Sequence, residues 1–443
     1  MIKEIFLICS LILPWYSVAQ EKNIKKFTVD DCFKYALKNS PEIKKRLFDL
    51  SDSKYDIDIE RAVFDLSISG GSSRNLETQT NASDIVLNQE IPGGVNVTAV
   101  GSLDSDDRDG SDEAALSLTI SKRLLGGGSI EKSLQRYRDS LVDELISRNL
   151  LEREKRDIKS DIQSIFYEII QNTQSLEVEK RRLESAKKNL EHAIERDKPL
   201  DIATAKIEIP QNELNLIRAE RRIQSNLDNL KVLIGMSPDA ELIIDEEFNY
   251  EALEFDIEED LMHAEENDEL FINNALLKKI LERDVRVKKE DTQVDVDLRF
   301  QQRLVNEGTE SANLNGNDEQ IISINFGFDL GRRADKARLA KSKNRLDENA
   351  VDRYILRQNK FRDLRGIARE LEETETSIKI QDQRIELNET QIELFKDRWE
   401  NGEIDILEYI RSQNNLESSR VQLIRLKTNY MDLVNRYLFE VGK

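Results

Sequence analysis

The chain has 443 residues, of which 35% are charged and only 6% aromatic, and its formal net charge is −21. Too few apolar side chains are present to fill several compact cores, so the composition favours long helices that each bury a narrow apolar stripe. The acidic balance excludes nucleic acid as a partner, because phosphate would be repelled.

The first 19 residues have the layout of a secretory signal peptide. Lys3 precedes an apolar run from residue 5 to residue 13, and small residues end the segment at Ala19. The run is too short to cross a bilayer as a helix, and no later segment has about 18 consecutive apolar residues. We therefore expect export with removal of residues 1–19, and entry into a membrane only as strands.

The rest of the chain is an internal duplication. Leu118 matches Ile322 and Leu183 matches Leu387, both at an offset of 204 positions. A weaker echo relates Ala36 to Ala264. Each half reads helix, strands, helix, tip, helix.

This pattern divides the mature chain into three parts. We predict a first structural repeat at residues 20–238 and a second at residues 260–443. Between them, residues 239–259 form an acidic linker that we expect to lie outside the helices, near the equator of the molecule.

Short alternating runs predict strands in both repeats. The runs are at residues 62–70, 113–121, 294–301 and 320–330, within strand regions of about 62–124 and 294–330. An insert at residues 83–102 predicts a further hairpin that turns at Gly93 and Gly94. So few strands cannot close a barrel, and lipid does not tolerate an open sheet edge, so insertion would require several copies of the chain. A small sheet capped by helices in a water-soluble protein is the alternative.

Long helices are predicted at residues 129–235 and 332–442. In the second region Ile378 and Ile385 repeat at a spacing of seven, beside a second stripe that contains Ile380 and Leu387. Two stripes let one helix contact neighbours on both sides, as a closed cylinder of helices needs. An ordinary antiparallel coiled coil explains the stripes equally well, but it does not explain why strands interrupt the helices at matching points.

Four segments carry a resemblance to a known family. They are FTVDDCFKYALKNSPEIK (27–44), LSLTISKRLLGGG (116–128), INFGFDLGRR (324–333) and RWENGEIDILEYIRSQNNL (398–416). In this order, and with the duplication, they resemble the TolC-like outer-membrane efflux proteins over nearly the whole mature chain. The resemblance implies a mainly α fold with a small β part. It also implies a homotrimer, whose long antiparallel coiled-coil helices form an α-barrel and whose strands share one transmembrane β-barrel. The family uses four strands per chain, and the insert at 83–102 departs from that count.

The resemblance also implies a function. The chain would be the passive outer-membrane exit duct of a tripartite efflux or type I secretion system. It would contact outer-membrane lipid and span into the periplasm of a Gram-negative type of cell. Its partners would be a periplasmic adaptor (a membrane fusion protein) and an inner-membrane pump. The sequence does not identify the cargo as drug, metal, peptide or protein. The alternatives are an adaptor-independent diffusion channel and an exported structural coiled-coil protein.

Acidic residues at the tip are the candidate pore residues. Glu408 matches the first tip aspartate of the family, where acids face the tunnel and attract cations, whereas Arg411 takes the place of the second. Asp405 and its repeat mate Asp201 lie at the turns. For these two we expect capping of the following helix more than a pore role.

The turns themselves are the expected adaptor contacts, through Pro199, Arg398 and Gly402. Glycine at 402 permits a tight turn. Trp399 continues the stripe of Ile378 and Ile385, which predicts a packing role. Pro210 is expected to bend or interrupt its helix.

The residue pattern does not favour an enzyme. The chain has two histidines, His192 and His263, and neither has a cysteine or second histidine at ligand spacing. No carboxylate stands in a recognisable apolar pocket. We therefore predict no catalytic site, no metal site and no cofactor.

Overall fold

The computed structural model describes residues 26–106, 111–245, 250–307, 318–328 and 331–443. The predicted signal peptide lies outside these residues. The helices are α1 (Val29–Asn39), α2 (Pro41–Ala62), α3 (Ile130–Ser133), α4 (Gln135–Glu195), α5 (Pro199–Ile234), α6 (Ile257–Asn267), α7 (Glu269–Glu290), α8 (Arg333–Glu400) and α9 (Ile406–Val441). The strands are β1 (Ser67–Asn75), β2 (Thr80–Ile91), β3 (Val95–Asp106), β4 (Ser111–Leu125), β5 (Asp295–Glu307) and β6 (Asp318–Gly327).

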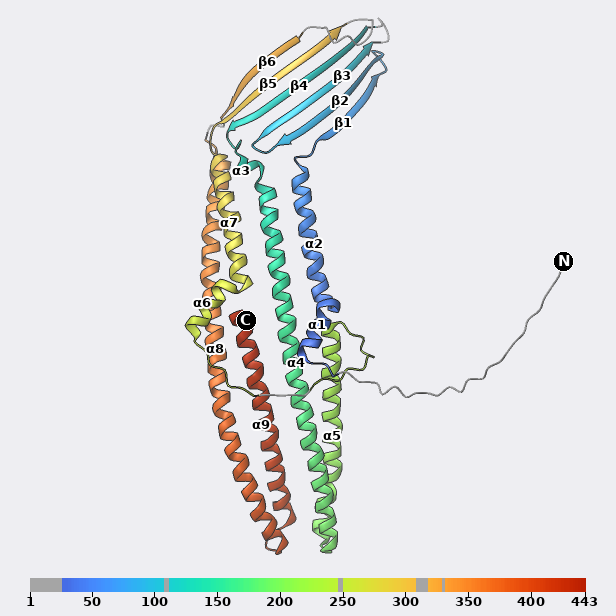
Figure 1. Cartoon of the computed structure of the whole chain (residues 1–443), viewed down its shortest axis with the longest axis vertical. Helices are drawn as coiled ribbons and strands as arrows, with labels where there is room; N and C mark the ends of the chain where they lie inside the picture. The colour runs from blue at the N-terminus through green and yellow to red at the C-terminus, as the bar shows by residue number, and fades with distance from the viewer. Residues whose placement is uncertain (1–25, 107–110, 246–249, 308–317, 329–330) are drawn as a thin grey trace, which may run out of the picture.

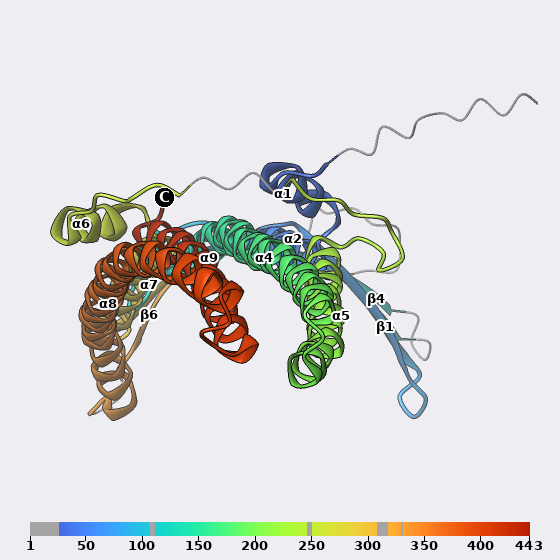
Figure 2. The ribbon, with the colours of Figure 1, turned by 90° about the horizontal axis from the view of Figure 1, so that it is seen from below.

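The molecule is a long strip with a sheet at one end and helices extending away from it (Figure 1). Seen along the helices, the layer is curved, with a convex side that carries α1 and α6 and a concave side (Figure 2). The expected fold class, mainly α with a small β part, is confirmed. None of the described helices has an apolar stretch long enough to cross a bilayer.

The sheet contains six antiparallel strands in sequence order, so β1 and β6 are its edges. The predicted hairpin at residues 83–102 is confirmed as β2 and β3. Its turn holds Gly93 and Gly94 at φ of 103° and 69°, in the left-handed region that favours glycine. The backbone N–H of Gly93 donates to Ser133 Oγ at 2.8 Å, which ties this turn to α3.

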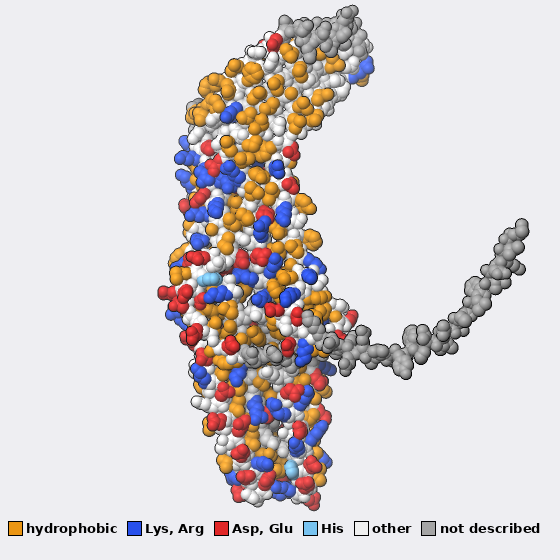
Figure 3. Space-filling view, in the orientation of Figure 1, with side chains coloured by type: hydrophobic (Ala, Val, Ile, Leu, Met, Phe, Trp, Pro, Cys, Tyr) orange, Lys and Arg blue, Asp and Glu red, His pale blue; other side chains and the backbone are white. Residues whose placement is uncertain are grey.

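One face of the sheet is apolar across all six strands. The strand register places the following side chains on that face: Ile68, Ile85, Leu87, Val97, Leu116, Leu118, Ile120, Leu298, Phe300, Ile322, Ile324 and Phe326. Successive side chains alternate between faces, and the opposite face is mostly Ser, Thr, Asn, Gln and charged residues. Figure 3 shows the apolar side chains gathered over the sheet, on the side that is convex in Figure 2.

The start of the first predicted strand, residues 62–70, is wrong. Helix α2 continues through Ala62, and β1 begins only at Ser67. The N–H groups of Phe64 and Asp65 donate to the carbonyls of Arg61 and Ala62, which extends the helix by a tight turn. Val63 and Phe64 therefore lie in a turn and not in a strand, because these local hydrogen bonds satisfy the backbone.

Of the two effects expected at Pro210, the interruption is wrong, because α5 runs unbroken from Pro199 to Ile234, and the bend stays a prediction. A proline inside a helix removes one backbone hydrogen bond and crowds the preceding turn. Helix α5 packs along α4 over its length, and Ala205, Asn212 and Ala219 are buried there. Tertiary packing therefore outweighs the local preference of the proline.

The helices are arranged so that the strip has two different long edges. Helix α4 lies inside it, between α2 and α7 near the sheet and between α5 and α9 near the tip. Helix α8 contacts α7 and α9 on one side and α6 near its middle, but toward the sheet and toward the tip no described element lies on its other side. We call α2, α5 and β1 the first edge, and α8 with β6 the second edge.

A buried ion cluster holds the middle of the strip together. Lys360 of α8 is 4% exposed, and its Nζ donates to Asp268 at 2.7 Å and to Glu440 at 2.6 Å. Asp268 also caps α7, accepting from the N–H of Leu270 at 2.8 Å, and forms an ion pair with Arg153 of α4. The cluster thus joins four helices that are far apart in the sequence.

Lys360→Met is expected to lower the free energy of unfolding by about 3 kcal/mol, because it leaves Asp268 buried without its nearest cation. The double variant Lys360→Met/Asp268→Asn should recover part of the loss, because asparagine keeps the cap without the charge. Thermal unfolding followed by circular dichroism checks both. A double variant less stable than the single one would contradict this explanation.

Candidate tunnel face and tip

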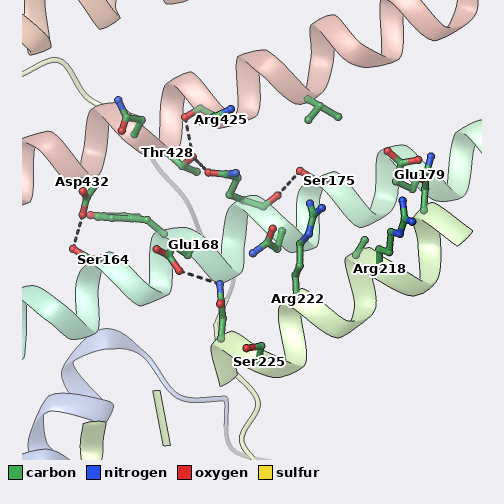
Figure 4. Close-up of a pocket in the computed structure, with 18 residues that line it drawn as sticks. Ser164, Glu168, Ser175, Glu179, Arg218, Arg222, Ser225, Arg425, Thr428 and Asp432 are labelled. Carbon is green, nitrogen blue, oxygen red and sulfur yellow. Dashed lines mark hydrogen bonds between the residues drawn. The ribbon is translucent and has the colours of Figure 1, made fainter. Parts of the chain in front are cut away.

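A long groove lies on the concave side of the strip, with α4 as its floor and α5 and α9 as its walls. Its volume is about 860 Å³. The floor and walls are mostly polar, with serine, asparagine and threonine between the charged side chains (Figure 4). Such a groove can contact a polar solute along the helix axes, but it does not enclose one.

The charges in the groove are unevenly paired. Glu168 accepts from Asn226 at 3.1 Å, and Asp432 accepts from Ser164 at 2.5 Å. Arg218, Arg222 and Arg425 also line the groove. Within the described part of the chain, these three arginines have no side-chain ion pair or hydrogen bond. Their positive charge is therefore exposed to a solute on the concave side, although the chain as a whole is strongly acidic.

The tip consists of two turns, residues 196–198 between α4 and α5 and residues 401–405 between α8 and α9. Both hairpins end toward the concave side (Figure 2). A small apolar core joins them around Trp399, which is 3% exposed and stacks on Tyr409 with ring centroids 5.1 Å apart. The predicted packing role of Trp399 is confirmed.

Arg196 links the two turns. Its guanidinium lies 4.5 Å from the centroid of the Trp399 ring and donates to the carbonyls of Trp399 at 2.7 Å and Glu400 at 3.0 Å. These carbonyls end α8, where a cation is favoured by the helix dipole. No sequence pattern indicates this role, because the partners are backbone atoms 203 and 204 positions away.

The capping prediction for the two turn aspartates is wrong. Lys198 occupies the N-cap of α5, so Asp201 is the third helical residue and is buried (5% exposed). Pro199 sets this phase, because its fixed φ suits the first helical position. Asp405 does occupy the N-cap of α9, but its exposed side chain makes no capping hydrogen bond.

Glu408 is exposed in the first turn of α9, and Arg411 is exposed one turn further on. A carboxylate here also suits the helix N-terminus electrostatically. The two opposite charges are close in sequence, so the tip presents a mixed charge pattern. The pore role of Glu408, Asp405 and Asp201 stays a prediction.

The predicted adaptor residues lie at the exposed end of the tip. Pro199, Arg398 and Gly402 are all exposed, and Gly402 has a φ of 76°. Arg398 forms an ion pair with Glu403 at 3.3 Å across its own turn. These residues are accessible to a partner, and their adaptor contact stays a prediction.

The histidines and the buried cysteine show no metal-binding arrangement. In the described residues, no group of three His, Cys, Asp or Glu side chains could hold a metal ion. His192 packs edge-on against Trp399, and His263 Nδ1 lies 3.1 Å from the carbonyl of Val441. Burial raises the pKa of Cys32 to about 12, so its thiol stays protonated.

Comparison with known proteins gives the fold. No family model and no curated protein sequence matches the chain. Solved structures do match. CusC, described as forming a transmembrane channel, has a TM-score of 0.71 at 12% identity, covering 94% of this chain and 92% of its own. The outer membrane protein VceC of Vibrio cholerae has a TM-score of 0.70 at 14% identity, covering 94% and 96%. The CmeC outer membrane channel of Campylobacter jejuni has a TM-score of 0.69 at 14% identity, covering 94% and 85%.

The chain therefore has the fold of these outer-membrane channels over nearly its whole length. The TolC-like fold expected from the sequence is confirmed. At identities this low the match extends to the arrangement of helices and strands, and it transfers the role of no residue.

Arg196→Gln is expected to loosen the tip, because it removes two hydrogen bonds from a cation at a cost of about 2 kcal/mol or more. Single-channel recording in planar bilayers should show more frequent or larger openings. Lys198→Gln is the matched control, since this neighbouring cation has no side-chain partner among the described residues. Equal conductance of both variants and wild type would show that Arg196 does not hold the tip closed.

If Glu408 has the pore role predicted from the sequence, Glu408→Ala lowers the preference for cations over anions, because it removes a carboxylate from the tip. Reversal potentials in a salt gradient measure this preference. Glu403→Ala, which removes an acid paired with Arg398, should change it less. An unchanged reversal potential in Glu408→Ala would remove this residue from the pore.

Proposed function

We propose that the chain is one subunit of a homotrimeric outer-membrane exit duct of a tripartite efflux or type I secretion system. The duct would carry cargo passively from a periplasmic adaptor and an inner-membrane pump to the exterior. The observation that carries this proposal is the pair of unfilled long edges of the strip. Everything needed for a closed tunnel is present in the chain except the neighbour that completes each edge.

The sheet supports a membrane position for the assembled form. Its apolar face looks to the convex side and its polar face to the concave side. Both β1 and β6 have an open edge, which lipid does not tolerate. Pairing β1 of one copy with β6 of the next removes both edges and leaves the apolar face outside.

The tip halves of the two edges support the same closure, because each carries an exposed apolar stripe at a spacing of seven. On α8 these residues are Ile380, Leu387 and Leu394, exposed by 60%, 71% and 62%. On α5 they are Leu200, Ile207 and Leu214, exposed by 73%, 71% and 42%. Helices α5 and α8 run in opposite directions along the strip, so the two stripes can pack as an antiparallel pair.

The duplication shows which neighbour α8 lacks. Its repeat mate α4 packs against α9, where Gln171 accepts from Thr428 and Asn189 donates to Gln413. The repeat mates of the α8 stripe, Leu176, Leu183 and Leu190, are partly buried on α4. Helix α9 lies beside α4, but no described helix of the same chain lies at the corresponding position beside α8. Helix α5 of another copy can occupy that position.

Joining the first edge of one copy to the second edge of the next is a head-to-tail contact, and repeated rotation closes it into a ring. The resemblance gives three copies. In such a ring the concave groove faces the tunnel, and the tip narrows its far end. Pro199, Arg398 and Gly402 are then free to contact the adaptor.

Ile207→Asp is expected to weaken the assembly more than tenfold, because a carboxylate would be buried in an apolar contact. Mass photometry in detergent measures the oligomeric state. Met262→Asp is the control, since Met262 is similarly exposed (59%) but lies on α6, outside both stripes. An Ile207→Asp protein that assembles like wild type would contradict the edge contact.

Planar bilayer recording of the purified mature protein tests the function. The duct predicts channels that stay mostly closed without an adaptor and open when the tip is loosened. Wide, constantly open channels would favour an adaptor-independent diffusion channel. A monomer with no affinity for detergent or bilayers would favour an exported coiled-coil protein and would end the proposal.

A further inference from the structure

We propose that the sheet-proximal half of the contact between copies is charge-complementary and recognises only another copy of this chain. An acidic, aromatic face of α2 would lie against a basic face of α8 in the next copy, with Asp52 opposite Arg345 and Asp56 opposite Lys341. This inference rests on the proposed ring and specifies its self-recognition. We call this contact the upper seam.

The first side of the upper seam is the outer face of α2. Arg46 and Ser53 turn toward α4, where they meet Glu154 at 2.9 Å and Ser147 at 2.6 Å. The other side of the helix leaves Phe48, Tyr55 and Ile59 exposed by 70%, 62% and 63%. Large apolar side chains exposed together along one edge helix indicate a contact surface.

Acidic residues accompany this apolar face. Residues 49–60 contain five acids and one lysine. Asp52 and Asp56 are one helical turn apart, so they share a side of α2. Both are exposed, and in the described chain neither has an ion pair or a side-chain hydrogen bond.

The second side of the upper seam is the start of α8. Residues 332–345 contain seven lysines and arginines and one acid, in a chain whose net charge is −21. Lys341 and Arg345 are again one turn apart and exposed, and no described residue forms an ion pair with either. Further along the helix, Val351 and Ile355 are exposed by 56% and 48%.

The internal duplication sets the register between the two sides. Inside the chain, α4 and α7 are antiparallel neighbours, with Asp139 opposite Arg283 and Asn149 opposite Asn273. Helix α8 is the repeat mate of α4 at an offset of 204, and α2 is the mate of α7 at an offset of 228, the spacing of Ala36 and Ala264. The contact of α4 with α7 inside one chain is thus the template for α8 with α2 of the next copy.

Applied to these pairs, the offsets place Lys343 opposite Tyr55 and Arg353 opposite Lys45. In a pair of antiparallel helices, the residue number rises along one helix as it falls along the other. From the first pair, Lys341 therefore comes within one residue of Asp56, and Arg345 within one residue of Asp52. Asp52 and Asp56 are one turn apart, and so are Lys341 and Arg345. One register of the two helices therefore brings each acid next to a cation.

The charge state inside one copy agrees with this assignment. Burial raises the pKa of the Asp143 carboxyl on α4, and repulsion from Asp56 adds to the increase. Asp56 thus faces a like charge in its own chain, with no described cation paired to it. Lys341 of the next copy would supply the missing cation.

Complementary charges on opposite edges give specificity as well as attraction. A chain with a different charge pattern would place like charges together, which is costly at a contact. The tip half of the contact is apolar and indifferent to charge. The upper seam therefore decides which chains join, and it is the part of the contact that salt weakens.

Charge reversal tests the upper seam in the full-length mature protein. Asp52→Lys/Asp56→Lys and, separately, Lys341→Glu/Arg345→Glu should each weaken assembly roughly tenfold or more, because two attractions per contact become repulsions. The variant with all four reversals should assemble as wild type does. Asp58→Lys is the matched control, since this exposed acid of α2 is not assigned to the seam.

Co-expression with two affinity tags measures the self-recognition. The fourfold variant should co-purify with itself but not with wild type, whereas wild type co-purifies with wild type. Circular dichroism reports whether each variant is folded. Oxidation of Asp52→Cys/Arg345→Cys should cross-link neighbouring copies, and Asp52→Cys/Arg338→Cys, two turns out of register, should not.

Two results would overturn the upper seam while leaving the duct intact. One is that the two double variants form rings as stably as wild type at low salt. The other is that the fourfold variant mixes freely with wild type. A wild-type protein that is monomeric at all concentrations is a different result, because it removes the proposed ring itself.

Discussion

One constraint governs this molecule: apart from its contact with α6 near the middle, helix α8 is packed on one side only. Its repeat mate α4 has neighbours on both sides, and these neighbours, α2 and α5 on one side and α7 and α9 on the other, belong to the same chain. A duplicated chain with one open edge in each half, α2, α5 and β1 in the first and α8 with β6 in the second, has the form of a repeating unit. The apolar stripe at Ile380, the cations at Lys341 and Arg345, and the open edge of β6 all follow the same side of the strip. The described part of a single chain offers no apolar surface, acidic partner or strand to cover these groups.

The two ends of the strip meet different physical demands. At the sheet, one face is apolar across six strands, and the β2–β3 hairpin widens that face beyond the four strands that the resemblance implies. At the tip, stability comes from a small aromatic core and from Arg196, whose two hydrogen bonds end α8. Between them the buried Lys360–Asp268 cluster joins four helices. The concave side, with Arg218 and Arg222, is left polar and unoccupied by packing.

Periodicity predicted those features that depend on repeating patterns. The spacing of seven placed Trp399 in a packed stripe, and alternation with two glycines placed the hairpin at 83–102. Features set by contacts between distant or unlike elements were not predictable. The α2–β1 boundary depends on hydrogen bonds near Phe64, the phase of α5 on Pro199, and the role of Arg196 on backbone atoms across the tip. The charge pattern of α8 was present in the sequence, but its meaning required knowing that this helix is an edge.

The central claim is that copies of this strip join edge to edge around a hole. Electron microscopy of the purified mature protein in detergent tests it most directly. We expect end-on class averages of a closed ring with three-fold symmetry and a central opening, and side views of a long cylinder with a detergent belt at one end. Single strips, or pairs related by a two-fold axis with no opening, would contradict the claim.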